Sequence, residues 1–228
     1  MKTSRPVANL LILGVYGYYF RLSSVDSDLF YRSVQEDETL EWGTFWAFVL
    51  ATAVFAAAAR KVPVGRGWFL WLLSLFCFAV ALEEISWGQR ILGFRPPAYF
   101  LANNYQQELN IHNVMSQDAR TLGLQSALLG YGVLVPFLAL WPPVRRFMER
   151  LGIVPAPAFL IPSFLATSYL HWTYPLKFTG EIVEMMLGLG LLFSGLLELH
   201  RTASPGSPLR RLPAALPLLA GFILAMGL

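Results

Sequence analysis

The chain has 228 residues, of which 56% are hydrophobic and 14% are charged, and its formal net charge is +3. One soluble core could not bury so many apolar side chains, so this composition excludes an ordinary soluble domain and favours an integral membrane protein. The single cysteine, Cys77, excludes a disulfide or a cysteine metal cluster within the chain.

Seven apolar stretches approach the length of a membrane crossing, because a hydrocarbon layer of roughly 30 Å takes about 20 apolar residues in a helix. In chain order they cover residues 7–20, 42–59, 67–82, 122–141, 156–174, 181–197 and 212–228. The third is expected to stay helical through two glutamates as far as Ile91. We therefore predict an all-α, polytopic transmembrane helix bundle of about seven spans, forming one integral membrane domain over residues 1–228.

The basic residues predict the orientation of these spans. With a cytoplasmic N-terminus, the inner segments hold 11 of the 17 Lys and Arg residues, which is the bias that cytoplasmic loops carry. The eleven are Lys2, Arg5, Arg60, Lys61, Arg66, Arg145, Arg146, Arg150, Arg201, Arg210 and Arg211. By the same count, 12 of the 14 acidic residues lie outside. We expect a protein of the bacterial inner (plasma) membrane, in contact with membrane lipids, with its acidic face outside and no nucleic-acid partner.

The outer end of the third span carries Glu83 and Glu84, followed by Ser86, Gln89 and Arg90. Carboxylates at a helix C-terminus oppose the helix dipole, so another interaction has to stabilise them. If the helix continues, Glu83, Ser86 and Arg90 share one face. An ion pair that ties the helix to a loop and a functional cluster at membrane depth are both consistent with this pattern.

The loop that follows is rich in amides and contains Glu108, Asn110, His112 and Asn113. On a helix, Glu108 and His112 would be one turn apart and could share a metal ion. A solvated pair or a helix cap would have the same spacing.

The last polar segment joins the fifth and sixth spans and contains His171, Lys177, Glu181 and Glu184. Glu181 falls in the first turn of the sixth span, where a carboxylate is favoured by the helix dipole. Glu184 lies deeper and has no such explanation. His171 fits either an interfacial hydrogen-bonded residue or a metal ligand.

Together these segments predict one site at the outer face, since two histidines and several carboxylates suit zinc or another divalent ion that activates a water molecule. We predict catalytic roles for Glu84, His112 and Glu184, and substrate-binding roles for Gln89, Arg90, Asn110 and Asn113. The predicted metal ligands are Glu84, Glu108, His112, His171, Glu181 and Glu184.

The strings EEISWGQRILG and NYQQELNIHN, with EDETLEW before the second span, resemble a family of bacterial polytopic membrane proteins of uncharacterised activity. The resemblance covers about the first half of the chain. A more distant similarity links the seven spans, Ser86 and His112 to the ceramidase and progestin-receptor-like hydrolases, which hold zinc within the membrane. The HxxxH pair of that superfamily is missing here, because His171 and His200 are far apart.

Three function classes remain open at this point. The first is a metal-assisted hydrolase or transferase acting on a lipid or lipid-linked substrate at the outer face. The second is an accessory or assembly subunit of a larger membrane protein complex, for which the polar cluster would be a docking surface. A transporter ranks third, because its site is expected near the bilayer midplane and not at the helix ends.

Overall fold

The computed structural model describes residues 4–35, 37–63, 65–204 and 207, and within them all regular structure is helical. Three continuous stretches are long and apolar enough to cross a membrane: α3 (Thr39–Ala59), Gln117–Leu138 and α12 (Thr179–Thr202). The second comprises α8 (Gln117–Gln125), the π-helix η2 (Ser126–Leu134) and α9 (Val135–Leu138). A fourth crossing results if α4 (Trp68–Glu84) and the bent stretch Ser86–Leu92 form one span. The all-α class, with helices able to cross a membrane, is confirmed. The described residues support three or four crossings and not seven, and the predicted seventh stretch, 212–228, lies outside them.

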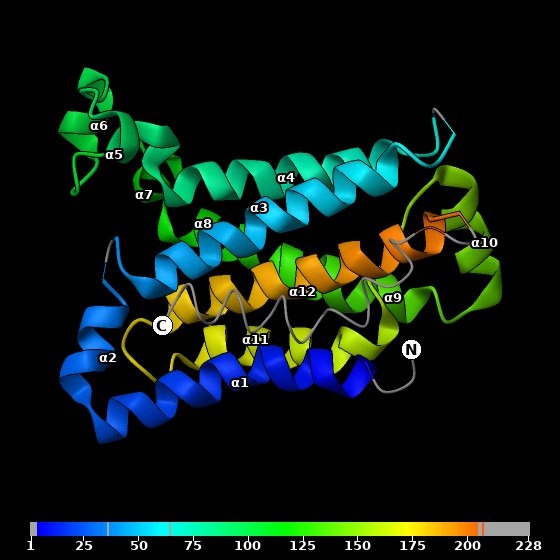
Figure 1. Cartoon of the computed structure of the whole chain (residues 1–228), viewed down its shortest axis with the longest axis horizontal. Coiled ribbons are helices and arrows are strands. Elements are labelled where there is room, and N and C mark those ends of the chain that lie inside the picture. The colour runs from blue at the N-terminus through cyan, green and yellow to red at the C-terminus, as the bar shows by residue number, and fades with distance from the viewer. Residues whose placement is uncertain (1–3, 36, 64, 205–206, 208–228) are drawn as a thin grey trace.

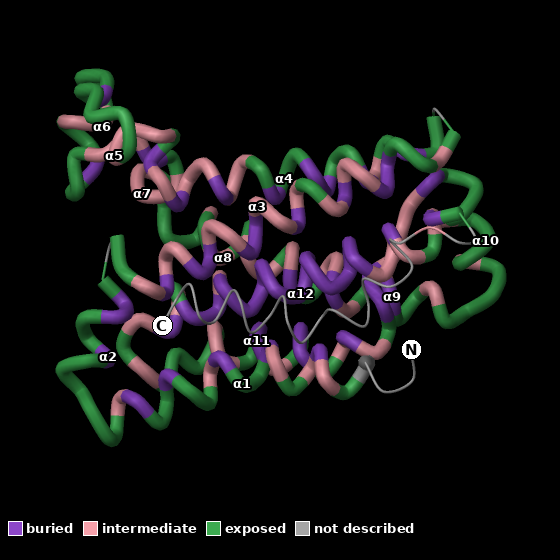
Figure 2. The backbone as a smooth tube through the Cα atoms, viewed as in Figure 1, coloured by how far each residue is buried: buried purple, intermediate pink, exposed green. Residues whose placement is uncertain are grey.

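Helix α12 is the centre of the bundle (Figures 1 and 2). In its most apolar stretch 83% of the residues are buried, compared with 44% in α3 and 17% in the Gln117–Leu138 stretch. Glycines let neighbouring helices approach it closely, since a Cβ at Gly190 would lie 2.9 Å from the ring of Phe164. The first and fifth predicted spans correspond to α1 (Ser4–Val25) and to η3 (Ala158–Leu160) with α11 (Ile161–Thr173), which also pack beside α12.

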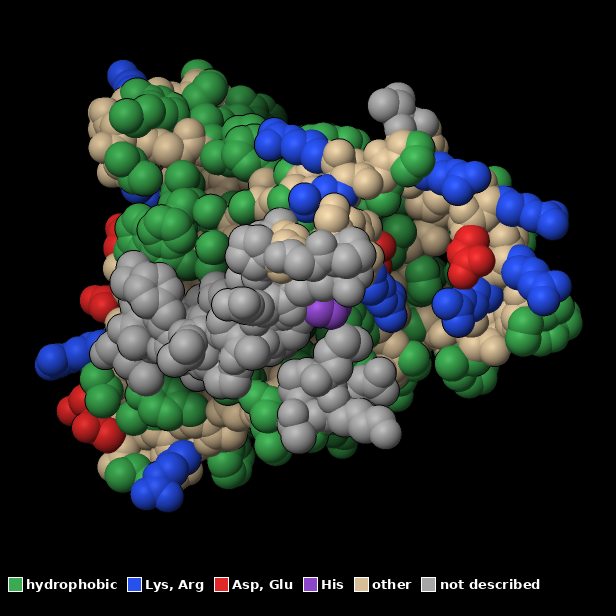
Figure 3. All heavy atoms as spheres, turned by 45° about the vertical axis from the view of Figure 1, so that its right-hand side comes forward, with side chains coloured by type: hydrophobic (Ala, Val, Ile, Leu, Met, Phe, Trp, Pro, Cys, Tyr) green, Lys and Arg blue, Asp and Glu red, His purple; other side chains and the backbone are tan. Residues whose placement is uncertain are grey.

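The two ends of the bundle differ in charge. One end carries the surface helix α10 (Pro142–Leu151) with three arginines, and Lys and Arg side chains gather around it (Figures 1 and 3). The opposite end, called the acid-rich end below, is where α3 and α12 begin and α4 ends. Four short helices lie at this end (Figure 1): α5 (Gln89–Leu92), α6 (Ala98–Asn103) and α7 (Ile111–Val114) are grouped beyond the end of α4, and α2 (Ser27–Ser33) lies apart from them beside the end of α1.

The continuous helix predicted through Ile91 is wrong. Helix α4 ends at Glu84, and the short 3₁₀ turn η1 (Ser86–Gly88) redirects the chain into α5, with a bend of 66°. Ser86, Trp87 and Gly88 all have positive φ, at 47°, 55° and 82°, which no continuing α-helix permits. As a result, Glu83, Ser86 and Arg90 do not share a helix face.

The predicted helical pairing of Glu108 with His112 is also wrong. The segment before α7 is irregular, with a positive φ of 58° at Gln107, and helix begins only after Asn110. The side chains of Asn104 and Asn110 explain this, because short amides hydrogen-bond nearby backbone groups and compete with a helix. Asn104 bonds the backbone of both Gln106 and Glu108, and Asn110 caps α7.

Candidate functional site

A cavity of about 160 Å³ lies at the acid-rich end, and most of its wall is polar. Its lining residues are Val34, Gln35, Leu40, Glu41, Glu84, Gln106, Glu108, Asn110, His112, Asn113, Phe178, Glu181 and Glu184. We call it the acid-rich cavity. A smaller one of about 60 Å³, the side cavity, shares Glu41 and Glu84 with it and is also lined by Arg90 and aromatic residues.

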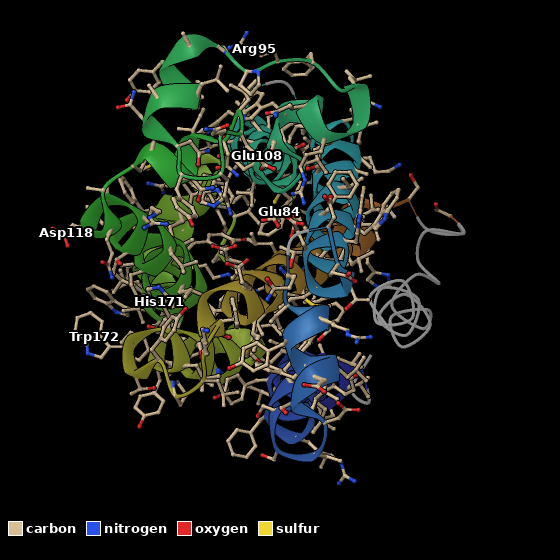
Figure 4. The ribbon with its side chains drawn as sticks, turned by 90° about the vertical axis from the view of Figure 1, so that its left-hand side faces the viewer. Glu84, Arg95, Glu108, Asp118, His171 and Trp172 are labelled. Carbon is tan, nitrogen blue, oxygen red and sulfur yellow. The ribbon has the colours of Figure 1, made fainter. Side chains whose placement is uncertain are left out.

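The five carboxylates of the acid-rich cavity come from four parts of the chain. Glu41 is in the first turn of α3 and Glu181 is in the first turn of α12, where the helix dipole favours negative charge, whereas Glu184 lies one turn deeper in α12. Glu84 ends α4, where the dipole disfavours it, and Glu108 belongs to the irregular loop. Figure 4 shows Glu84 and Glu108 toward the centre of this end of the molecule.

Arg90 connects three of the segments that form the cavity. Its guanidinium lies 2.7 Å from the carboxylates of both Asp37 and Glu41 and 3.7 Å from that of Glu108. A second nitrogen of the guanidinium also donates to Glu41, so this contact is bidentate, which is the strongest arrangement for an arginine and a carboxylate. The Arg90 side chain is only 12% exposed. Arg90 therefore has a structural role in addition to the substrate-binding role predicted for it.

Glu83 and His112 form an acid–base pair at the cavity wall. Glu83 accepts a hydrogen bond of 2.9 Å from the backbone N–H of His112 and lies 3.4 Å from its Nδ1. Trp87 donates to the other Glu83 oxygen. Burial alone lowers the pKa of His112, but the hydrogen bond with Glu83 and the negative charges of Glu184, Glu83 and Glu181 outweigh it, so that pKa lies above 6.5.

Several predicted polar residues hold the loop in place. Gln89 accepts a 2.6 Å hydrogen bond from the backbone of Leu109 and is not part of the cavity wall. Asn110 donates to the backbone of Glu83. Asn113 donates to Gln106, and Ser86, which is fully buried, donates to Glu108. Ser86 is therefore committed to Glu108 and is not placed as an exposed nucleophile.

His171 is the predicted metal ligand that the structure separates from the others. It lies on α11, where its Nδ1 is 2.9 Å from the side chain of Gln125, and it is not among the residues of the acid-rich cavity. Figure 4 shows it toward one edge of the acid-rich end, beside Trp172. Within the described part of the chain, no three His, Cys, Asp or Glu residues are arranged to hold a metal ion. Zinc binding stays a prediction.

Two residues of the site were not predicted from the sequence. Glu41 fits the preference of acids for helix N-termini, but its carboxylate also anchors Arg90. Gln35, ahead of α3, lines the cavity although nothing distinguishes it in the sequence. The charges in the sequence could have pointed to Glu41. Arg90 is the only basic residue between positions 67 and 94, so an acidic partner for it was to be expected.

Comparison with family models, with curated proteins and with solved structures finds no match for this chain. The site is therefore interpreted from its own chemistry.

The Glu83–His112 pair predicts a pH-dependent stability. Because the folded pKa of His112 is raised, the pair stabilises the fold fully below pH 6.5 as long as Glu83 stays ionised, and it loses this contribution as the pH rises through the folded pKa of His112. The imidazole is 40% exposed, so we expect less than about 1 kcal/mol. Thermal unfolding of wild type and His112→Gln in detergent, compared across this pH range, measures it. Equal pH profiles for wild type and His112→Gln would contradict the assignment.

Proposed function

We propose that this protein is a membrane-embedded hydrolase or transferase whose acid-rich cavity acts on a lipid or lipid-linked substrate. The observation that carries the proposal is the convergence of Glu84, Glu184 and the Glu83–His112 pair on one cavity from three different helices. General acid–base catalysis requires titratable groups held around a space that a substrate can enter.

His112 is the best candidate for proton transfer. Glu83 occupies the Nδ1 side of the ring, which leaves Nε2 as the nitrogen available to a bound substrate. A carboxylate that orients an imidazole in this way also stabilises the imidazolium that forms when the base takes up a proton. Glu84 and Glu184 would supply or accept the second proton, or bind a cationic part of the substrate. Metal analysis of the purified protein tests whether these carboxylates also hold a metal ion.

The surroundings of the cavity suit a substrate that arrives from the lipid phase. Large apolar side chains are exposed on η1, α5 and the segment through α6: Trp87, Ile91, Leu92, Phe94 and Tyr99. An exposed apolar patch beside a polar cavity is typical of a surface that meets a membrane or a partner protein. The alternative function, an accessory subunit, would use the same patch for docking.

We further propose seven spans, a cytoplasmic N-terminus and an acid-rich cavity on the outer side of the inner membrane. The support is the charge difference between the ends, since the arginines of α10 lie at the opposite end from the cavity and basic segments stay in the cytoplasm. The stretch 212–228 would be the seventh span.

Catalysis can be tested by incubating the purified protein with lipids extracted from the source membrane and following each lipid class by mass spectrometry. We expect one class to be converted, and His112→Gln to slow the conversion by roughly 10²- to 10⁴-fold while the fold is retained. His171→Gln, a histidine outside the cavity, should leave the rate unchanged. The absence of any conversion, together with stoichiometric copurification of a partner whether or not His112 is present, would favour the accessory subunit instead.

The orientation can be tested with two cysteine variants in a Cys77→Ala background. Tyr105 is fully exposed at the acid-rich end, and Phe147 is 59% exposed on α10. A membrane-impermeant maleimide added to intact spheroplasts should label Tyr105→Cys, and it should label Phe147→Cys only after lysis. The reverse pattern would show that the cavity faces the cytoplasm.

A further inference from the structure

Glu84 is a buried acid without a partner. The residue is only 7% exposed, yet within the described chain no hydrogen bond or ion pair reaches its carboxylate. Arg90 donates a hydrogen bond to the backbone carbonyl of Glu84, and its guanidinium forms ion pairs with the carboxylates of Asp37, Glu41 and Glu108. A charged group that is buried without compensation is costly, so such a carboxylate either holds a proton or meets a cation that comes from outside the chain.

The position of Glu84 leaves room for that cation. Glu84 lines both the acid-rich cavity and the side cavity, and so separates two spaces that a ligand could occupy. Glu184 lines the larger one and likewise has no hydrogen bond or ion pair among the described residues. Of the three positive side chains near them, Arg90 is engaged with three carboxylates and His112 with Glu83, while the exposed Arg120 acts on Glu184 through its charge without forming an ion pair among the described residues. The uncompensated charge facing the cavities is therefore negative.

The donor geometry favours an ammonium group over a bare metal ion. A metal needs several ligand atoms at about 2.0 to 2.6 Å from one point, and within the described residues no such group of three exists. An ammonium needs acceptors only at hydrogen-bond distance, at about 2.8 Å, and one carboxylate with neighbouring amide oxygens suffices. Asn110, Asn113 and Gln106 line the larger cavity beside the two free carboxylates.

The size and the aromatic walls of the two cavities fit the same ligand. An engineered cavity of about 150 Å³ holds a benzene molecule, so the acid-rich cavity has room for an aminoethyl group and its neighbouring atoms. Trp42 and Phe45 line the side cavity with their rings 5.5 Å apart, and Phe178 lines the larger one. Aromatic faces attract cations. Outside the cavity Lys177 already lies over Phe178, with its Nζ 5.3 Å from the ring centroid.

We propose that the acid-rich cavity binds the primary ammonium group of an amine-bearing substrate, with Glu84 as its direct carboxylate partner. This rests on the proposed function, for which it names the substrate class. The ammonium can belong to an aminoethyl lipid headgroup or to a soluble amine, and both present the same N–H donors to the carboxylate.

Ligand-dependent stabilisation separates these sources. Thermal unfolding is measured for the purified full chain with ethanolamine, and in nanodiscs of phosphatidylcholine with and without phosphatidylethanolamine, since a ligand that binds only the folded state raises the melting temperature. Choline and Zn²⁺ are the comparison ligands. We expect stabilisation by ethanolamine if the soluble amine is bound, or by phosphatidylethanolamine alone if the headgroup is needed, and in both cases none by choline.

Variants of the glutamates test whether the stabilisation comes from binding in the acid-rich cavity. Glu84→Gln keeps the size of the side chain and removes its charge, so binding should weaken by roughly tenfold to a hundredfold. Glu38→Gln removes an exposed acid from the same end, outside the cavity wall, and should bind as wild type does. Glu184→Gln serves as the second variant if Glu84→Gln does not fold, and it should weaken binding in the same direction.

The opposite results are equally clear. Equal stabilisation by choline, stabilisation by Zn²⁺ alone, no stabilisation by any amine, or amine binding that survives both glutamine variants would each overturn the ammonium assignment. Catalysis is a separate readout. Amine binding without lipid conversion would contradict the proposed enzymatic activity but not the ammonium site. Conversion of a lipid that has no amine would contradict the ammonium site but not the enzymatic activity.

Discussion

Arg90 is the residue on which the acid-rich end depends. A guanidinium that is 12% exposed is stable only when its charge is compensated, and three carboxylates from two parts of the chain do this. Asp37 and Glu41 belong to the start of α3, and Glu108 belongs to the loop before α7. To reach all three, the chain must leave the axis of α4 before Arg90, which explains why the helix breaks after Glu84.

The break itself is strained. Ser86 and Trp87 both adopt a left-handed backbone, which costs of order 1 to 3 kcal/mol for each non-glycine residue. The hydrogen bonds from Ser86 to Glu108 and from Trp87 to Glu83 form in this conformation and offset part of the cost. The same turn brings Glu83 to His112, while Glu84 faces the cavities. Strain that persists at a polar site is consistent with a functional requirement for this geometry.

The sequence predicted which segments form the site but not how they are connected. Ionisable residues at the ends of apolar stretches identified Glu84, His112 and Glu184, and these residues do line one cavity. Helical spacing in the sequence predicted the wrong contacts between the residues around them. It joined Glu108 to His112, whereas Glu108 contacts Ser86, after the break in α4, and His112 contacts Glu83, before it. Asparagine side chains and positive φ angles prevent the helix that this spacing assumed. Spacing carries no information about such side-chain competition.

His171 shows a second limit of the sequence. Its position at the acid-rich end of an apolar stretch matches that of the other site residues, but the direction it faces depends on how α11 packs against the Gln117–Leu138 stretch. There Gln125 bonds both Ser168 and His171, so this histidine belongs to a contact between two helices. The fold class, by contrast, follows from composition alone, since an all-helical chain is one of the two ways to satisfy backbone hydrogen bonds in lipid.

The central claim is that Glu84 is left unpaired by the protein so that it can pair with a ligand. The most direct test is an experimental structure of the protein in nanodiscs made from its native lipids, at a resolution that shows side chains and bound headgroups. We expect density that does not belong to the protein within hydrogen-bond distance of the Glu84 carboxylate. A structure in which a protein cation fills that position, or in which Glu84 is turned away from both cavities, would contradict the claim.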